Sequence, residues 1–206
     1  MPTRSVERGA SPTRRRLLDA AEKLVRTAGL AGVTTKALAR EARHSEAMLY
    51  QHFASKDELL VCLLRERLSA LHSAVYAGPA RDLDTQSTEQ GCHDLAYRTI
   101  RYYEAAVPLL CPLLADPSLL AACGVDPPPP YGARHEPPPA LVATLERWRE
   151  AGRVRSDADL AVAATILAGA CFQWVLQRQW GSAAGAVRDE EDFTANLART
   201  LAHSLA

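Results

Sequence analysis

The sequence lacks the features that equip most enzymes. It has no glycine-rich loop for binding phosphates, and its histidines, cysteines and carboxylates do not occur at metal-ligand spacing. Cys92, His93 and Asp94 are the residue types of a catalytic triad, but consecutive helical residues point about 100° apart, so these side chains cannot converge on one substrate. We therefore predict a protein that is not an enzyme and that uses no metal and no cofactor.

Signals for secretion, disulfides and membrane insertion are also missing. The charged N-terminal residues 1–16 contain no apolar core of a signal peptide. The longest apolar stretch, residues 160–176, is short for a membrane span and is flanked by Asp159 and Arg178. The 5 cysteines are odd in number and irregularly spaced, so we interpret them as reduced thiols that serve as small apolar residues. We expect a cytoplasmic protein that makes no contact with a membrane.

The chain carries no net charge, because 24 Lys and Arg balance 24 Asp and Glu. The distribution is uneven: residues 1–68 hold 13 basic and 8 acidic residues, whereas residues 69–206 hold 11 basic and 16 acidic residues. The balances are therefore +5 and −5. Chance partitioning is one explanation; a basic N-terminal module joined to an acidic remainder is the interpretation with a functional consequence.

Alternation typical of strands is hard to find, whereas apolar residues recur with a period near 3.6, so the sequence predicts an all-α fold of about nine helices. Capping residues, prolines and glycines mark the boundaries. The segment 124–139 contains seven prolines and is expected to be a loop, with docking of a proline-recognising partner as an alternative. The expected long helices cover about residues 12–28, 56–77, 89–106, 108–123, 139–151, 157–180 and 189–205. Two short helices are expected between the first two of these: one capped by Thr34 or Thr35, with Leu38, Ala39 and Ala42 facing inward, and one capped by Ser45, with Leu49, Tyr50 and Phe53 on one side.

Two short helices are expected close together in ALAREARHSEAMLYQHF, residues 37–53. A longer helix precedes them and another follows, which is the order of a helix-turn-helix module whose second short helix lies in the DNA major groove. All-helical proteins that do not bind DNA also contain adjoining short helices, so the spacing alone leaves both interpretations open. The predicted organisation is a flexible arm over 1–11, this module over 12–55, and a larger helical domain over 56–206.

Residues 14–64, especially GLAGVTTKALAREA followed by LYQHFASKDELL, resemble the DNA-binding module of the TetR (tetracycline-repressor-like) family of bacterial transcriptional regulators. The shared pattern is a threonine-capped helix, Leu-Tyr-x-His-Phe, and Ser-Lys-x-x-Leu-Leu. The rest of the chain matches loosely, through length, helicity and the segment EAGRVRSDADLAVAATILAGACFQW. The resemblance implies a homodimer that binds a pseudo-palindromic operator in double-stranded DNA, and a repressor that an unknown small-molecule effector releases.

Side-chain chemistry and the resemblance together assign two roles within the module. Basic and hydroxyl side chains contact phosphates without conveying sequence information, whereas the exposed first turns of the second short helix recognise bases. The expected phosphate contacts are Arg14, Arg15, Arg16, Thr35, Tyr50, His52 and Lys56, and the expected base contacts are Lys36, Ser45, Glu46, Ala47, Met48 and Gln51.

Several of these residues have structural alternatives. Residues 14–16 also fit a solvated helix end, Tyr50 fits simple packing, and Glu46 favours the positive end of a helix dipole whether or not it touches DNA.

The turn between the two short helices departs from the family's sequence pattern, in which a glycine is usually followed by a small apolar residue. This chain has Arg43 and His44. A non-glycine residue in the left-handed region costs on the order of 1 kcal/mol, which a phosphate contact by Arg43 would offset. Either Arg43 accepts a strained turn to reach a phosphate, or the turn is built differently from its relatives. His44 is expected to be a neutral, buried imidazole with one satisfied nitrogen; a pH-sensitive contact is the alternative.

The resemblance places a dimer interface in the last two helices and a small-molecule pocket among the central ones. Aromatic walls would favour an apolar or aromatic ligand. Intramolecular core is the alternative for both sets. The expected pocket residues are Tyr97, Tyr102, Tyr103, Cys111, Trp148, Phe172, Gln173 and Trp174, and the expected interface residues are Leu160, Ala164, Leu167, Ala168, Cys171, Phe193, Leu197, Leu201 and Leu205.

Two other functional classes stay open. An all-helical small-molecule-binding protein without sequence-specific DNA binding is favoured if the surface from Arg14 to Lys56 proves inert toward DNA. A regulator that responds to oxidation of a cysteine is the second alternative.

Overall fold

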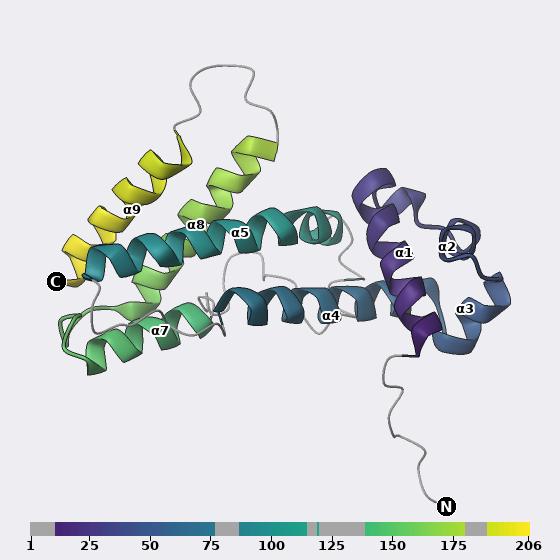
Figure 1. Ribbon diagram of the computed structural model, residues 1–206, viewed down its shortest axis with the longest axis horizontal. Helices are drawn as coiled ribbons and strands as arrows, with labels where there is room; N and C mark the ends of the chain where they lie inside the picture. Colours follow the sequence, from purple (N-terminus) through teal and green to yellow (C-terminus); the bar gives the residue numbers. More distant parts are fainter. Residues whose placement is uncertain (1–10, 77–86, 115–118, 120–138, 180–188) are drawn as a thin grey trace, which may run out of the picture. The chain divides into compact units, whose positions relative to one another are not determined.

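The computed structural model describes residues 11–76, 87–114, 119, 139–179 and 189–206 (Figure 1). These residues form eight α-helices and one 3₁₀ turn and contain no strand, which confirms the predicted all-α class. The predicted arm and most of the proline-rich segment lie outside the described residues. The elements are α1 (Pro12–Ala28), η1 (Leu30–Gly32), α2 (Thr35–Ala42), α3 (Glu46–His52), α4 (Lys56–Tyr76), α5 (Thr88–Leu114), α7 (Pro139–Glu150), α8 (Leu160–Gln179) and α9 (Glu190–Leu205).

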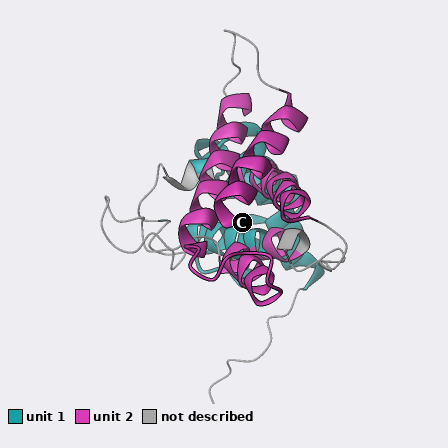
Figure 2. Cartoon of the chain, turned by 90° about the vertical axis from the view of Figure 1, so that its left-hand side faces the viewer, with its two compact units in different colours: residues 1–68, 108–129 teal, residues 69–107, 130–206 magenta. Residues whose placement is uncertain are grey.

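The chain divides into two compact units (Figure 2). Unit 1 comprises residues 1–68 and 108–129, and unit 2 comprises residues 69–107 and 130–206. The predicted module over 12–55 lies wholly in unit 1, whose core extends beyond it into the first half of α4.

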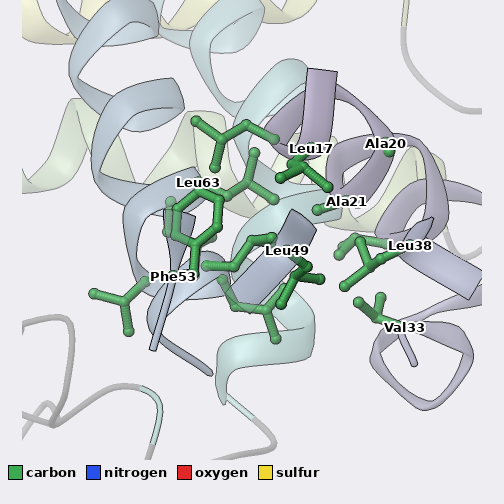
Figure 3. Packing of buried hydrophobic residues seen from close by; sticks show 14 of the residues in the cluster. Leu17, Ala20, Ala21, Val33, Leu38, Leu49, Phe53 and Leu63 are labelled. Carbon is green, nitrogen blue, oxygen red and sulfur yellow. The ribbon is translucent and has the colours of Figure 1, made fainter. Parts of the chain in front are cut away.

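Unit 1 has a core of close-packed aliphatic side chains from α1, α2, α3 and α4 (Figure 3). Leu17, Leu38 and Leu49 are fully buried, and Phe53 closes the core next to Leu63. Each such leucine contributes about 1.5–3 kcal/mol relative to an exposed one. This core holds the two short helices in place and leaves their other faces to solvent.

Local signals explain the boundaries of the helices in unit 1. The Ser11 hydroxyl accepts from the Arg14 N–H at 3.1 Å, Pro12 occupies the first turn, and Gly29 with φ 65° ends α1. The Ser55 hydroxyl accepts from the Glu58 N–H at 3.0 Å at the start of α4. The predicted limits of these helices are confirmed to within a residue or two.

The predicted break between helices over 89–106 and 108–123 is wrong, because α5 is continuous through Pro108 and Pro112. Residues 115–118 and 120–123 of the second range lie outside the described residues. A proline inside a helix removes one hydrogen bond and costs about 3 kcal/mol. Ala106, Val107 and Leu109 are all buried around the first of these prolines, and their burial offsets that cost.

The start of α8 differs from the predicted range, which began at about residue 157. α8 begins at Leu160, where the Asp159 carboxylate accepts from the Val162 N–H at 3.0 Å, so Asp159 is the cap. Asp189 occupies the cap position of α9, but its side chain makes no capping hydrogen bond.

Unit 2 is formed from the C-terminal part of α4, most of α5, and α7, α8 and α9. One close approach depends on glycine: a Cβ at Gly91 of α5 would lie 2.6 Å from the ring of Trp148 on α7. Trp174 of α8 stacks on Phe193 of α9, with ring centroids 4.4 Å apart.

Candidate nucleic-acid interface

α2 and α3 are short helices that begin with hydroxyl caps. The Thr34 side chain accepts from the Ala37 N–H at 3.1 Å, and the Ser45 side chain accepts from the Met48 N–H at 3.2 Å. α3 buries Leu49 alone among its seven residues. The rest of its surface is therefore free to face a partner.

The turn between α2 and α3 is a Schellman motif, the hydrogen-bonded turn that commonly ends a helix at glycine. The Arg43 N–H donates to the Arg40 carbonyl at 3.2 Å, and the His44 N–H donates to the Ala39 carbonyl at 2.9 Å. Arg43 has φ 56° and ψ 44°, and no other non-glycine residue of the described chain has a positive φ. The turn thus keeps the left-handed geometry, with an arginine in the glycine position.

His44 occupies the position after Arg43, where a Schellman motif usually has an apolar contact. The residue is half-buried, and its Nε2 is buried with no hydrogen-bond partner among the described residues. An unsatisfied buried polar group costs about 1–3 kcal/mol. The turn between α2 and α3 is therefore destabilised at two residues, by the left-handed backbone at Arg43 and by the Nε2 of His44, which the described residues leave unpaired.

The residues assigned to base recognition cluster at the start of α3. Glu46, Ala47 and Gln51 are exposed, and Met48 is half-buried. Ser45 is exposed, but its hydroxyl already accepts the capping hydrogen bond. The helix therefore presents a carboxylate, a methyl group and an amide, which can pair with or contact different base edges.

The residues assigned to phosphates surround these positions. Tyr50 is 56 % exposed, so packing does not explain it. Thr35, His52 and Lys56 are half-buried near the ends of the short helices. Lys36, which was assigned to bases, is exposed next to Thr35 in the first turn of α2. Arg15 and Arg16 are exposed in the first turn of α1.

Arg14 differs from its two neighbours. Its guanidinium donates to the Glu66 carboxylate at 2.5 Å and lies 5.3 Å from the centroid of the Phe53 ring. Burial by itself lowers the pKa of Arg14, but the hydrogen bond and the charge of Glu66 raise it above its ordinary value. In this structure Arg14 is engaged in holding α1 to α4, and its phosphate contact stays a prediction.

Arg40 was missed in the sequence. It is exposed and lies four residues after Lys36, so the two cations share one face of α2. The spacing of basic residues along a short helix was the signal that would have found it.

The predicted pocket residues do not form one wall. Tyr103 contacts Tyr102 and Phe172 edge-on, with centroid distances of 5.2 and 5.1 Å, and burial raises the pKa of Tyr102. Trp148 and Trp174 are buried in their own packing contacts. The remaining residues lie elsewhere: Tyr97 is 47 % exposed beneath the Arg101 guanidinium, Gln173 is exposed, and Cys111 belongs to unit 1.

Most of the predicted interface residues are buried inside unit 2 of a single chain. Phe193 and Leu197 keep part of their surface exposed. Burial of this kind favours the intramolecular alternative for the other residues, and their role in a dimer interface stays a prediction. The buried residues are Leu160, Ala164, Leu167, Ala168, Cys171, Leu201 and Leu205, none more than 6 % exposed.

The exposed face of α8 was missed because this helix is apolar on all sides. Val162 and Ile166 are 52 % and 50 % exposed, and Gly169 continues the same face. By length and composition α8 is also the one described helix that meets the requirements for a membrane span, with 44 % of the relevant window buried. The core helix of a globular unit passes the same test.

The N-terminal module matches a known family. Residues 17–62 match the family model for bacterial regulatory proteins of the tetR family. A segment of 58 residues is 40 % identical to YvkB of Bacillus subtilis strain 168, described as an uncharacterized HTH-type transcriptional regulator; it covers 28 % of this chain and 31 % of that protein. The match therefore spans about a third of the relative's length.

The fold is shared over almost the whole chain. A proposed TetR-family transcriptional regulator from Mesorhizobium loti MAFF303099 superposes with a TM-score of 0.74 at 17 % identity, covering 97 % of both chains. GusR of Salmonella enterica gives 0.67 at 20 % identity over 98 % of this chain and 99 % of that one. FadR of Bacillus halodurans, a fatty acid degradation regulator, gives 0.60 at 14 % identity over 94 % and 96 %. Residues 17–62 thus match the TetR family by sequence, and the chain as a whole shares the fold of these solved structures.

Proposed function

We propose that this protein is a cytoplasmic, homodimeric transcriptional repressor that binds a pseudo-palindromic operator and is released by a small apolar or aromatic ligand. The observation that carries the proposal is α3: it is capped, packed through Leu49, and exposed on its remaining faces. Lys36 before it and Lys56 after it supply positive charge on either side. A helix held in this way is suited to the major groove.

Dimerisation follows from the proposed operator, because one module of this size reads only one half-site. The exposed face of α8 through Val162, Ile166 and Gly169 offers an apolar surface with small residues that permit close approach. Phe193 and Leu197 of α9 are half-buried and extend the candidate surface. We assign the two-fold contact to these residues in place of the buried ones.

The effector is proposed to contact the aromatic group Tyr102, Tyr103 and Phe172 of unit 2. Rings that meet edge-on offer apolar surface, and the Tyr102 hydroxyl offers one polar contact. FadR, which shares the fold, is a regulator of fatty acid degradation, and this supports an apolar ligand. A coupling of about 1–3 kcal/mol between ligand and operator is sufficient for release.

Band-shift titration against DNA flanking the protein's own gene tests the proposal. The expected result is binding to one segment that weakens steeply with salt and is orders of magnitude tighter than binding to unrelated DNA. Equal affinity for all sequences, or no dependence on salt, contradicts it. Absence of binding to any DNA, together with binding of a small apolar molecule, would favour the alternative of a ligand carrier.

A further inference from the structure

Basic side chains lie at both ends of α3. Arg40 and Arg43 precede it, at the end of α2 and in the Schellman turn. His52 is the last residue of α3, and Lys56 is the first residue of α4. α3 has seven residues, so it is about 10 Å long. The major groove of DNA is about 12 Å wide, with a phosphate backbone along each wall. A helix of this length lying across the groove brings its two ends close to opposite walls.

The charge around Arg40 and Arg43 is available to a partner. Both side chains are exposed, and neither forms an ion pair within the part of the chain that the structure describes. The nearest carboxylate on α2, Glu41, is neutralised by Lys23 of α1 at 2.6 Å. Glu46, in the first turn of α3, is exposed and makes no ion pair with either arginine among the described residues.

The backbone at Arg43 shows that turn geometry alone does not account for this residue. α7 ends in the same kind of turn, where the Gly152 N–H donates to the Arg149 carbonyl at 3.0 Å and the Arg153 N–H donates to the Trp148 carbonyl at 2.9 Å. There the left-handed position, with φ 71°, is glycine. At the other turn the chain has an exposed cation in a conformation that L-residues avoid.

We infer that Arg40 and Arg43 contact phosphates on one wall of the major groove, opposite the wall contacted by Tyr50, His52 and Lys56. Unit 1 thereby contacts the phosphate backbones of both DNA strands around α3, an arrangement that we call the clamp. The left-handed turn at Arg43 lowers the stability of the fold but places the arginine where it can make this contact. The inference rests on the proposed function, since it requires the operator complex.

Two substitutions of Arg43 separate the effect of backbone strain on stability from the effect of side-chain charge on DNA binding. Arg43→Gly removes both, so its unfolding midpoint is expected to rise by about 2 °C. Arg43→Gln keeps the strained backbone and loses the charge, so its midpoint should stay at the wild-type value. Each variant of the dimer loses two phosphate contacts, and the slope of log affinity against log salt should fall by about 1.8 in both.

Phosphate ethylation interference on the operator locates the contacts. In each half-site, Arg40→Ala and Arg43→Gln should abolish interference on one strand, and Lys56→Ala should abolish it on the other. Arg149→Ala, an exposed arginine of α7, is the matched control and should leave the pattern and the salt slope unchanged.

The outcomes distinguish the two proposals. If the wild type binds its operator but the Arg43 variants keep the full salt slope, or lose the same phosphates as Lys56→Ala, the clamp is overturned and the proposed function stands. If the wild type binds no DNA specifically, both are overturned.

Discussion

Units 1 and 2 expose different surfaces. In unit 1 the exposed residues around α3 are polar or charged apart from alanines such as Ala47, and Tyr50 is 56 % exposed. In unit 2 the exposed residues along α8 include Val162 and Ile166, next to a face buried in the core. The buried faces of both units report on folding. The exposed faces distinguish a surface for nucleic acid from a surface for a second apolar face.

The largest expected effect comes from placing a charge on the exposed face of α8. Ile166→Asp would bury an unpaired carboxylate in the proposed dimer contact. A charge buried without a partner in an interface weakens association by on the order of 3 kcal/mol. We expect the dimer to dissociate by analytical ultracentrifugation and operator affinity to fall about 100-fold. Ala143→Asp, on an exposed position of α7, is the control and should change neither. A dimer that persists in Ile166→Asp would show that unit 2 pairs through another surface.

The two units differ in the burial of their cysteines: Cys92 and Cys171 of unit 2 are buried, whereas Cys62 of unit 1 is half-buried. The buried thiols should make the free energy of unfolding depend on pH. Burial raises the pKa of Cys171 to about 12, and burial with the nearby charge of Glu89 raises that of Cys92 to about 12. The unfolded chain ionises these thiols near 9 while the folded chain keeps them protonated, so stability is complete below pH 9 and falls as pH rises above it.

At pH 10 each of these two thiols should lower the free energy of unfolding by about 1.4 kcal/mol. Urea titrations at pH 8 and pH 10 measure the loss. Cys171→Ala should show about half of it, whereas Cys62→Ala, at a half-buried position of unit 1, serves as the control and should show all of it. A loss that Cys171→Ala leaves unchanged would rule out this cause.

Within unit 1 the exposed residues should separate into two kinds. Lys56→Ala and Tyr50→Ala remove phosphate contacts and should weaken binding to all DNA sequences alike, by roughly tenfold, whereas Met48→Ala should alter the preferred sequence with little change in the salt slope. Competitive band shifts with randomised operators measure both effects. Equal weakening on every sequence by Met48→Ala would argue against base recognition by α3.

The smallest effect concerns the two Schellman turns. Gly152→Ala places a Cβ in the left-handed position of α7 and should lower the free energy of unfolding by about 1 kcal/mol, the reverse of the sign expected for Arg43→Gly. Open space surrounds Gly152, so no clash contributes to the loss. Thermal unfolding of the two single variants tests the opposite signs, and a destabilised Arg43→Gly would mean that the arginine stabilises its turn.

Local chemistry made much of unit 1 predictable. Ser11, Thr34, Ser45 and Ser55 accept hydrogen bonds from backbone N–H groups two or three residues into their helices. Such contacts depend on neighbours along the chain, so a reader of the sequence can place them. The sequence motif also located the surface around α3.

Contacts between residues far apart in the sequence decided the features that the sequence did not predict. α8 is apolar on every side, so periodicity could not show that Ala164 and Cys171 turn inward while Val162 and Ile166 remain exposed. The adjacent arginines at positions 14–16 cannot be distinguished in the sequence. In the structure Arg14 pairs with Glu66, which lies 52 residues further along the chain.

The sequence by itself therefore determined the helical class, most helix limits and the helix-turn-helix module, because capping and periodicity act over a few residues. Only the tertiary structure decided which apolar face is core and which cation is already paired, because these depend on groups that folding brings together from far along the chain.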